Sequence, residues 1–201
     1  MIRRQLIIVA KEPRLGRVKT RLACDIGSVD AWKFYRQTLT DVSRRLSADA
    51  RWTTWLGVTP KRAFRKLSLW PGLNPHVNQG MGDLGKRMTK LITDVPRGPT
   101  VLIGADIPEV CPIHIWSAFR VLDRSEAVFG PTPDGGYWLF GLQRRRGPID
   151  VFQKVRWSSP HTLSDTRLNL PEHWRFEAVT ELNDIDDGIA FYALGTRRKT
   201  G

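Results

Sequence analysis

The chain has 201 residues, 41% of them hydrophobic and 26% charged, with a formal net charge of +12. This length suits one domain, which we place at residues 1–195, and the hydrophobic content argues against a disordered chain. No apolar run is long enough to span a membrane and no leader peptide is evident, so we expect a cytoplasmic protein. Residues 196–201 are predicted to be a disordered tail.

Apolar runs and amphipathic segments alternate along the first half of the chain. In chain order they predict a strand over Gln5–Ala10, a loop over Lys11–Leu22, a helix from Asp30 to Leu46, a strand over Arg51–Val58, a short helix over Lys61–Leu67, a loop over Ser68–Pro75, a weak strand over His76–Gln79, a helix over Asp83–Val95 and a strand over Thr100–Ala105.

The second half begins with the same alternation and then changes. We predict a helix over Pro112–Leu122, strands over Ala127–Gly130 and Tyr137–Leu142, an extended piece over Phe152–Trp157, a helix from Ser159 to Leu170, a strand over Arg175–Val179 and a helix over Ile185–Leu194. Strands that alternate with helices indicate a mostly parallel sheet covered on both faces, and the two strands around residues 130–137 add an antiparallel element.

The turn between those two strands carries Asp134, Gly135, Gly136 and Tyr137. Paired glycines often mark a positive φ or the close approach of another group, and backbone amides beside a carboxylate suit a sugar or phosphate ligand. An Asp-Gly hairpin without function is the alternative. We favour a substrate-binding turn because loop chemistry of this kind is concentrated at functional sites.

The loop after the first strand is rich in cations and includes Lys11, Gly16, Lys19 and Arg21. Such cations could hold phosphates, although the spacing is not that of a Walker A loop, and a solvated basic loop is the alternative.

Acidic residues follow the strand over Thr100–Ala105 and precede the last helix. Asp106 comes directly after that strand. Asp184 and Asp186 lie at the start of the last helix, where Asp184 could simply cap the helix. Carboxylates from two distant segments are also how Mg²⁺ is held against a nucleotide phosphate. We therefore expect Asp106 within about 8 Å of Asp184 or Asp186.

Two other functions are open to this sequence. Gly80–Gly85 matches the GxGxxG pattern of dinucleotide-binding oxidoreductases, but the strand before it is weak and Asp83 stands where a pyrophosphate would bind. The net charge of +12 would also allow nucleic-acid binding. We consider nucleic acid the less favoured partner because the arginines are scattered.

Six segments resemble, in order, an uncharacterised bacterial glycosyltransferase-like family sometimes called selenodomain-associated transferases. They are KEPRLGRVKTRL, GMGDLGKRM, IGADIPEV, GPTPDGGYWLFGL, VRWSSPHTL and LNDIDD. The resemblance implies a glycosyltransferase-A-like, Rossmann-like three-layer α/β/α sandwich with a mixed sheet. This family is similar to nucleotide-diphospho-sugar transferases and 2-phospholactate guanylyltransferases.

The resemblance also implies a function. It suggests a transferase that depends on Mg²⁺ or Mn²⁺ and acts on a nucleoside triphosphate or a nucleotide sugar, with an acceptor and an oligomeric state that the sequence does not define. Lys19 and Asp106 are then catalytic candidates. The candidate sets are Lys11, Gly16, Lys19 and Arg21 for nucleotide phosphates, Asp134, Gly135, Gly136 and Tyr137 for the sugar or acceptor, and Asp106, Asp184 and Asp186 for the metal.

Overall fold

The computed structural model describes residues 3–65, 70, 75–144 and 150–197. Seven strands form one mixed sheet in the order β3-β2-β1-β4-β6-β5-β7. The strands are β1 (Arg4–Lys11), β2 (Trp52–Thr59), β3 (His76–Asn78), β4 (Pro99–Gly104), β5 (Ala127–Pro131), β6 (Tyr137–Gln143) and β7 (Phe176–Ala178). Only β6 runs antiparallel to its neighbours, β4 and β5. The predicted mixed, mostly parallel sheet is confirmed.

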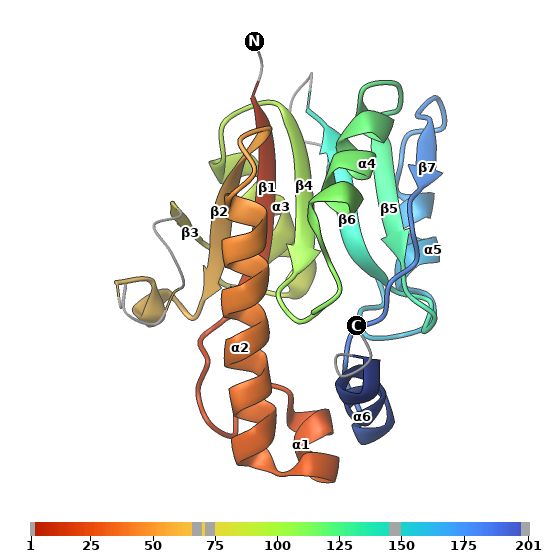
Figure 1. Ribbon diagram of the computed structural model, residues 1–201. Helices are drawn as coiled ribbons and strands as arrows, with labels where there is room; N and C mark the ends of the chain where they lie inside the picture. The colour runs from red at the N-terminus through yellow and green to blue at the C-terminus, as the bar shows by residue number, and fades with distance from the viewer. Residues whose placement is uncertain (1–2, 66–69, 71–74, 145–149, 198–201) are drawn as a thin grey trace.

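Helices cover both faces of this sheet, as expected of a three-layer α/β/α fold (Figure 1). On one face lie α2 (Ser28–Ser47) and α4 (Pro112–Leu122), whose apolar side chains join a buried cluster with β1, β2 and β4. On the other face α3 (Leu84–Asp94) and the segment around α5 (Thr162–Leu168) contribute to a second cluster. Helix α3 buries Met88, Leu91 and Ile92, so the predicted amphipathic spacing does face the sheet.

Three predictions about local structure were wrong. Helix α1 (Thr20–Ile26) lies where a loop was expected through Leu22, because Leu22 is buried against Ile185 and Ala31 from distant segments. Residues 152–157 form turns instead of an extended piece. The helix predicted from Ser159 begins only at Thr162, with His161 at its N-cap.

Other boundaries moved by a few residues, as is usual for helix ends. The helix expected over 61–67 is the 3₁₀ helix η1 (Lys61–Arg65), and most of the predicted loop over 68–75 lies outside the described residues. The last helix, α6 (Gly188–Arg197), begins three residues later than expected and includes the first two residues of the predicted tail. The rest of that tail, residues 198–201, lies outside the described residues.

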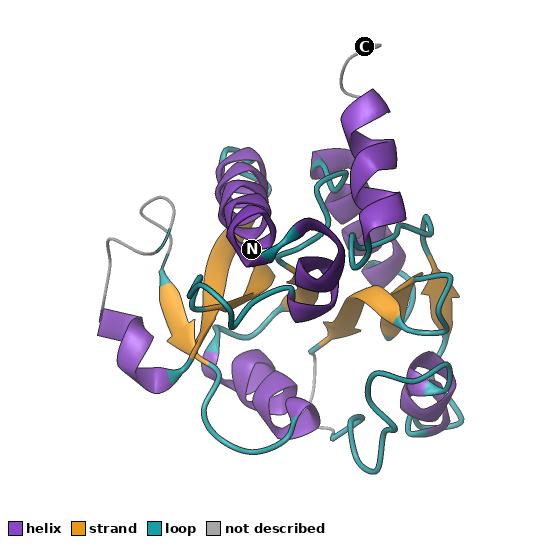
Figure 2. Cartoon of the chain, turned by 90° about the horizontal axis from the view of Figure 1, so that it is seen from below, coloured by secondary structure: helices purple, strands orange, loops and turns teal. Residues whose placement is uncertain are grey.

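Three connections meet at the carboxyl edge of the parallel strands. Strands β1, β4 and β5 end at Lys11, Gly104 and Pro131, and Figure 2 views the molecule from this edge. This is the edge at which open α/β sheets bind ligands. Within the described residues no helix is long and apolar enough to cross a membrane.

Candidate functional site

Three carboxylates from two distant segments meet at the carboxyl edge of the sheet. Asp106, Asp184 and Asp186 each place a carboxylate oxygen within 4.8 Å of those of the other two. The proximity expected of Asp106 and the late acidic segment is therefore present. Asp184 does not cap α6: the Oδ2 atom of Asp25 accepts from the Gly188 amide, and the Oδ1 atom of Asp187 accepts from the Ala190 amide.

Backbone contacts bring the two segments together. Asp106 follows the buried strand β4, where a side chain on Gly104 would lie 2.7 Å from the Asp106 Oδ1 atom and would push that carboxylate out of its present position. The chain after β7 runs beside β5, since the Val179 amide donates to the Phe129 carbonyl at 2.8 Å. The indole N–H of Trp138 donates to Thr180 O at 2.9 Å, which guides the chain toward Asp184.

The amine of Lys19 lies among these carboxylates. Its Nζ atom is 2.8 Å from Asp106 Oδ2, 2.7 Å from Asp186 Oδ1 and 3.8 Å from Asp184 Oδ2, and the side chain is only 4% exposed. Lys19 also adopts a left-handed backbone conformation, with φ 46°, just before α1. A non-glycine residue at such a φ is strained by about 1–3 kcal/mol, so the surrounding contacts must hold it.

Burial and charge act on the titration of this cluster. Burial alone would lower the pKa of the Lys19 amine, but attraction to Asp106 and Asp186 raises that pKa above its ordinary value, so the amine stays charged. Burial raises the pKa of the Asp184 carboxyl to about 6; Lys19 opposes the rise, while Asp186, Asp106 and Asp134 add to it. The acids outnumber the single buried amine, which leaves the cluster electronegative.

This donor set fits a hard divalent cation. Carboxylate oxygens are the ligands that Mg²⁺ and Mn²⁺ prefer, and the side chains of Asp106, Asp184 and Asp186 remain 33%, 31% and 39% exposed. Lys19 supplies the positive charge at this position in the structure. A bound divalent cation and the Lys19 amine could both contact these carboxylate oxygens only if the amine shifted.

Of the other expected phosphate-binding residues, only Arg21 is in contact with the cluster among the described residues. Arg21 reaches it, with Nη1 3.6 Å from Asp186 Oδ2, and its own side chain is 73% exposed. Lys11 ends β1, where its backbone N–H and carbonyl both bond to the Tyr35 hydroxyl. Gly16 is exposed at the tip of the loop, with φ 71°. Neither Lys11 nor Gly16 lines the cavity described next.

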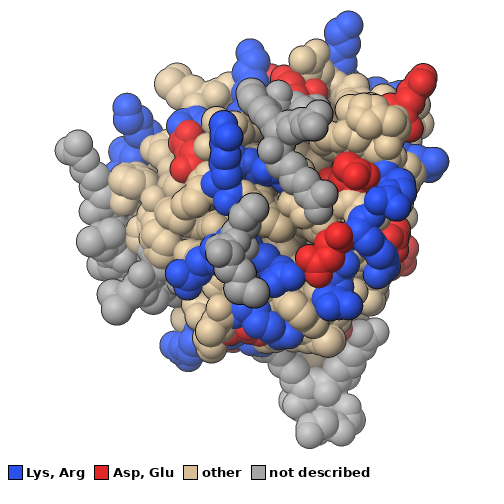
Figure 3. Space-filling model, turned by 90° about the horizontal axis from the view of Figure 1, so that it is seen from above, with Lys and Arg blue, Asp and Glu red and all other residues tan. Residues whose placement is uncertain are grey.

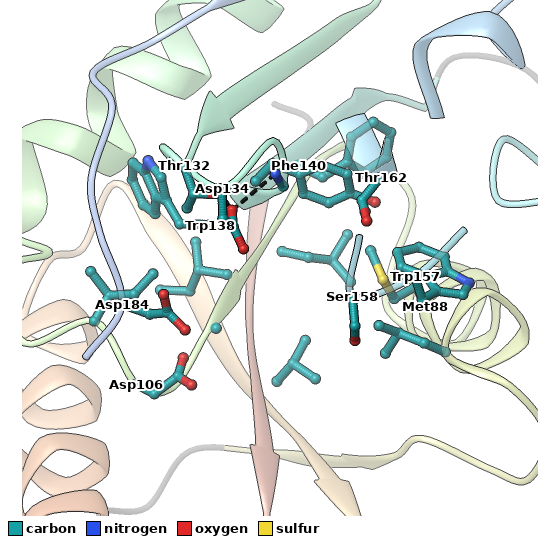
Figure 4. Close-up of a pocket in the computed structure, with 18 of the residues that line it drawn as sticks. Met88, Asp106, Thr132, Asp134, Trp138, Phe140, Trp157, Ser158, Thr162 and Asp184 are labelled. Carbon is teal, nitrogen blue, oxygen red and sulfur yellow. Dashed lines mark hydrogen bonds between the residues drawn. The ribbon is translucent and has the colours of Figure 1, made fainter. Parts of the chain in front are cut away.

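A cavity of about 390 Å³ opens beside the acidic cluster, and Asp106 and Asp184 line one end of it (Figure 4). The turn before β6 contributes Asp134, Gly136 and Tyr137 to the wall. The Oδ1 atom of Asp134 accepts from the Thr132 hydroxyl at 2.6 Å and from the Gly136 amide at 3.0 Å. Gly135 has φ 82°, and a side chain there would meet the Pro160 carbonyl at 2.3 Å, which fixes the turn against the next segment.

Sequence reasoning missed the opposite wall of the cavity. It is formed by Met88, Phe140 and Trp157, with Ser158 beside them. Met88 and Phe140 read in the sequence as ordinary core residues, and no local pattern distinguishes a core side chain from one at the edge of a cavity. Ser158 has φ 55°, a conformation that the sequence does not reveal.

Positive charge is mixed with negative charge at the amino ends of the strands. Figure 3 shows this face, where Lys and Arg lie beside Asp and Glu. Four arginines that precede or begin strands pair there with acids: Arg4 with Asp123, Arg51 with Asp49, Arg124 with Glu177 and Arg175 with Glu126. Among the described residues of this face, these pairs interrupt the positive charge, so they do not form the continuous basic surface that nucleic acid would require.

The glycine motif at Gly80–Gly85 does not open the first strand–helix turn. It follows β3, a three-residue strand at the edge of the sheet. The Asp83 carboxylate accepts from the Lys86 amide at 2.8 Å and so caps α3. A negative side chain at that helix start opposes a pyrophosphate, which disfavours a dinucleotide site.

Comparisons with known proteins agree with this architecture. A protein from Desulfovibrio desulfuricans, provisionally named a nucleotide-diphospho-sugar transferase, superposes with a TM-score of 0.87 at 26% identity over 99% of this chain and 89% of that one. The fold of this chain is therefore an α/β fold with the architecture of a nucleotide-diphospho-sugar transferase. The family model described as "Uncharacterized protein conserved in bacteria (DUF2064)" matches residues 38–159, and the chain belongs to this family.

More distant structures share the fold. CMP:2-keto-3-deoxy-manno-octonic acid synthetase complexed with CTP has a TM-score of 0.61 at 10% identity, over 98% of this chain and 99% of that one. A Mycobacterium tuberculosis protein in complex with manganese has a TM-score of 0.51 at 16% identity, over 96% and 97% of the two chains. No curated protein matches the sequence.

Proposed function

We propose that this protein is a divalent-cation-dependent transferase that acts on a nucleoside triphosphate or a nucleotide sugar. The observation that carries the proposal is the meeting of Asp106, Asp184 and Asp186 within 4.8 Å, beside a cavity at the carboxyl edge of the sheet. The similarity to a nucleotide-diphospho-sugar transferase and to a synthetase that binds CTP supports it. Mg²⁺ or Mn²⁺ would be the cation.

Each part of the site has a role in this proposal. Asp106, Asp184 and Asp186 hold the cation, which would neutralise phosphate charge as the bond to the leaving group breaks. Of the loop after β1, Arg21 reaches Asp186 and would bind the phosphates beside the cation, and Lys11 and Gly16 would contribute from the same loop. Lys19, whose amine pairs with these carboxylates in the structure, would shift toward a phosphate as the cation binds to them.

The chemical step transfers a group to an acceptor oxygen. The acceptor forms a bond to the α-phosphorus or to the anomeric carbon, and the bond to pyrophosphate or to the nucleoside diphosphate breaks with its electron pair. The acceptor proton passes to a carboxylate at the cavity. Asp134 is placed for this, because only its Oδ1 atom is engaged with Thr132 and Gly136 in the bonds described above.

A screen of nucleotides by thermal denaturation tests the proposal. Nucleoside triphosphates and nucleotide sugars should raise the melting temperature only when Mg²⁺ or Mn²⁺ is present, and a ligand at one hundred times its Kd adds about 2.7 kcal/mol of stability. Release of pyrophosphate or of nucleoside diphosphate then separates the two reactions. Stabilisation by a nicotinamide dinucleotide without cation, or salt-sensitive binding of DNA or RNA with no nucleotide effect, would contradict the proposal.

A further inference from the structure

The cavity beside the acidic cluster has two chemically different ends. Asp106, Asp134 and Asp184 lie at one end, while Met88 and Trp157 lie at the other (Figure 4). Val9, Leu84, Leu102 and Phe140 complete the apolar wall. A ligand that fills this volume must therefore present a polar group to the acids and an apolar surface to the far wall.

Three of the hydroxyl groups near the apolar end, those of Tyr137, Ser159 and Thr162, already have partners within the protein; the fourth is that of Ser158, which also lines the cavity. The Thr162 hydroxyl donates to the Arg156 carbonyl at 2.9 Å, and the Ser159 hydroxyl donates to the same carbonyl at 2.7 Å. The Tyr137 hydroxyl lies 3.3 Å from the Thr166 hydroxyl. Apart from the Ser158 hydroxyl, this wall offers a polyhydroxylated group little to replace its bonds to water, and each buried polar group left unpaired costs about 1–3 kcal/mol.

The apolar wall is built in advance of any ligand. The ring of Phe140 contacts that of Phe152 at a centroid distance of 5.1 Å, and Phe152 contacts Trp157 at 6.0 Å. Phe140 is buried in β6, and Met88 is only 7% exposed on α3. Such a set of packed rings keeps its shape, so the cavity selects for ligands that match it.

Charge at the polar end disfavours an anionic group. Four carboxylates, those of Asp106, Asp134, Asp184 and Asp186, face the buried amine of Lys19 and the exposed guanidinium of Arg21, and the proposed nucleotide would bring further negative charge along with its cation. A neutral hydroxyl can donate a hydrogen bond to a carboxylate there, whereas a second carboxylate would be repelled.

We propose that the acceptor is a compact alcohol with an apolar or aromatic body. Its body packs against Met88, Phe140 and Trp157, and its hydroxyl reaches the acidic end, where it attacks the nucleotide. A volume of about 390 Å³ holds one such small molecule. The inference rests on the proposed transferase function and goes beyond it by naming the acceptor class.

The test uses two probes of similar size and ligand-observed NMR titration of the full chain with diamagnetic Mg²⁺ and a nucleoside triphosphate. The probes are 2-naphthylmethanol and methyl glucoside. We expect the aromatic alcohol to bind with a Kd at least about tenfold lower than that of the sugar. Trp157→Ala and Met88→Gln should each raise the Kd of the alcohol about tenfold, equivalent to about 1.4 kcal/mol.

A matched control is Trp116→Ala. Trp116 lies on α4 under Arg4 and Arg51, away from the cavity, and its loss should leave the Kd of the alcohol unchanged. Tighter binding of the sugar, no binding of the alcohol, or an unchanged Kd in both cavity variants would overturn the acceptor class. Nucleotide binding with Mg²⁺, measured on the same samples, separates this failure from failure of the proposed function, because the Trp157 and Met88 variants should retain it.

Discussion

Replacing Asp106 with Asn should weaken cation-dependent nucleotide binding at least about a hundredfold, because even residues that only orient metal ligands are worth 10–100-fold in metal affinity. The melting temperature of the cation-free protein should stay equal or rise. Asn removes one of three mutually repelling carboxylates, and Lys19 keeps Asp184 and Asp186 as partners. Calorimetric titration of a nucleoside triphosphate, with and without Mn²⁺, measures the first effect.

Asp187→Asn is the matched control for this variant. Asp187 belongs to the same acidic segment, but it is exposed and accepts from the Ala190 amide at the start of α6. Because Asn caps helices about as well as Asp, this change should alter neither stability nor nucleotide affinity. Equal nucleotide affinity of the wild type and the Asp106→Asn variant would contradict the proposal that Asp106 binds the cation.

Replacing Lys19 with Met should lower the free energy of unfolding by about 1–3 kcal/mol in the absence of cation. The full loss of a buried ion pair is about 3–5 kcal/mol, and the partial exposure of the carboxylates reduces it. The sequence suggested that Lys19 is a phosphate-binding cation of the loop after β1. The structure adds a role in stability, because the amine is buried among acids.

Two further comparisons of stability between Lys19→Met and the wild type, both measured by urea denaturation, test this prediction. Mn²⁺ should stabilise the variant more than the wild type, because the cation replaces the missing charge. Lowering the pH toward about 6, the pKa of Asp184, should reduce the stability difference between the variant and the wild type. Protonation of Asp184 relieves its repulsion with the neighbouring carboxylates, which the variant no longer balances with an amine. Lys33→Met, at an exposed ion pair with Asp30, should change stability by less than about 0.5 kcal/mol. Equal stability of Lys19→Met and the wild type would contradict this account.

Periodicity in the sequence was enough to predict the central strands and the mixed sheet. The buried runs that became β1 and β4, and the two runs around residues 130–137, read as strands without ambiguity. Helix α1 could not be predicted in this way. Its seven residues are too short to be stable alone, and it owes its position to the burial of Leu22 against Ile185, more than 160 residues away.

The candidate site was predictable in composition but not in arrangement. Residue types and order identified Asp106, Asp184 and Asp186, because acids after a buried strand and before a helix stand out in the sequence. That Lys19 would enter the acidic cluster was not predictable, since its contacts depend on a left-handed backbone at a non-glycine residue. The wall of Met88 and Trp157 depends on which core residues border a cavity, which local patterns do not encode.

Electron paramagnetic resonance of Mn²⁺ tests the central claim most directly, because only free Mn²⁺ gives the full signal. The claim is that the three carboxylates hold one divalent cation together with a nucleotide. After subtraction of the Mn²⁺ that the nucleotide binds in the absence of protein, titration should show one Mn²⁺ bound per chain in the presence of a nucleoside triphosphate, with this binding lost in an Asp184→Asn, Asp186→Asn double variant. Absence of bound Mn²⁺ in the wild type, or equal binding by the double variant, would contradict the account.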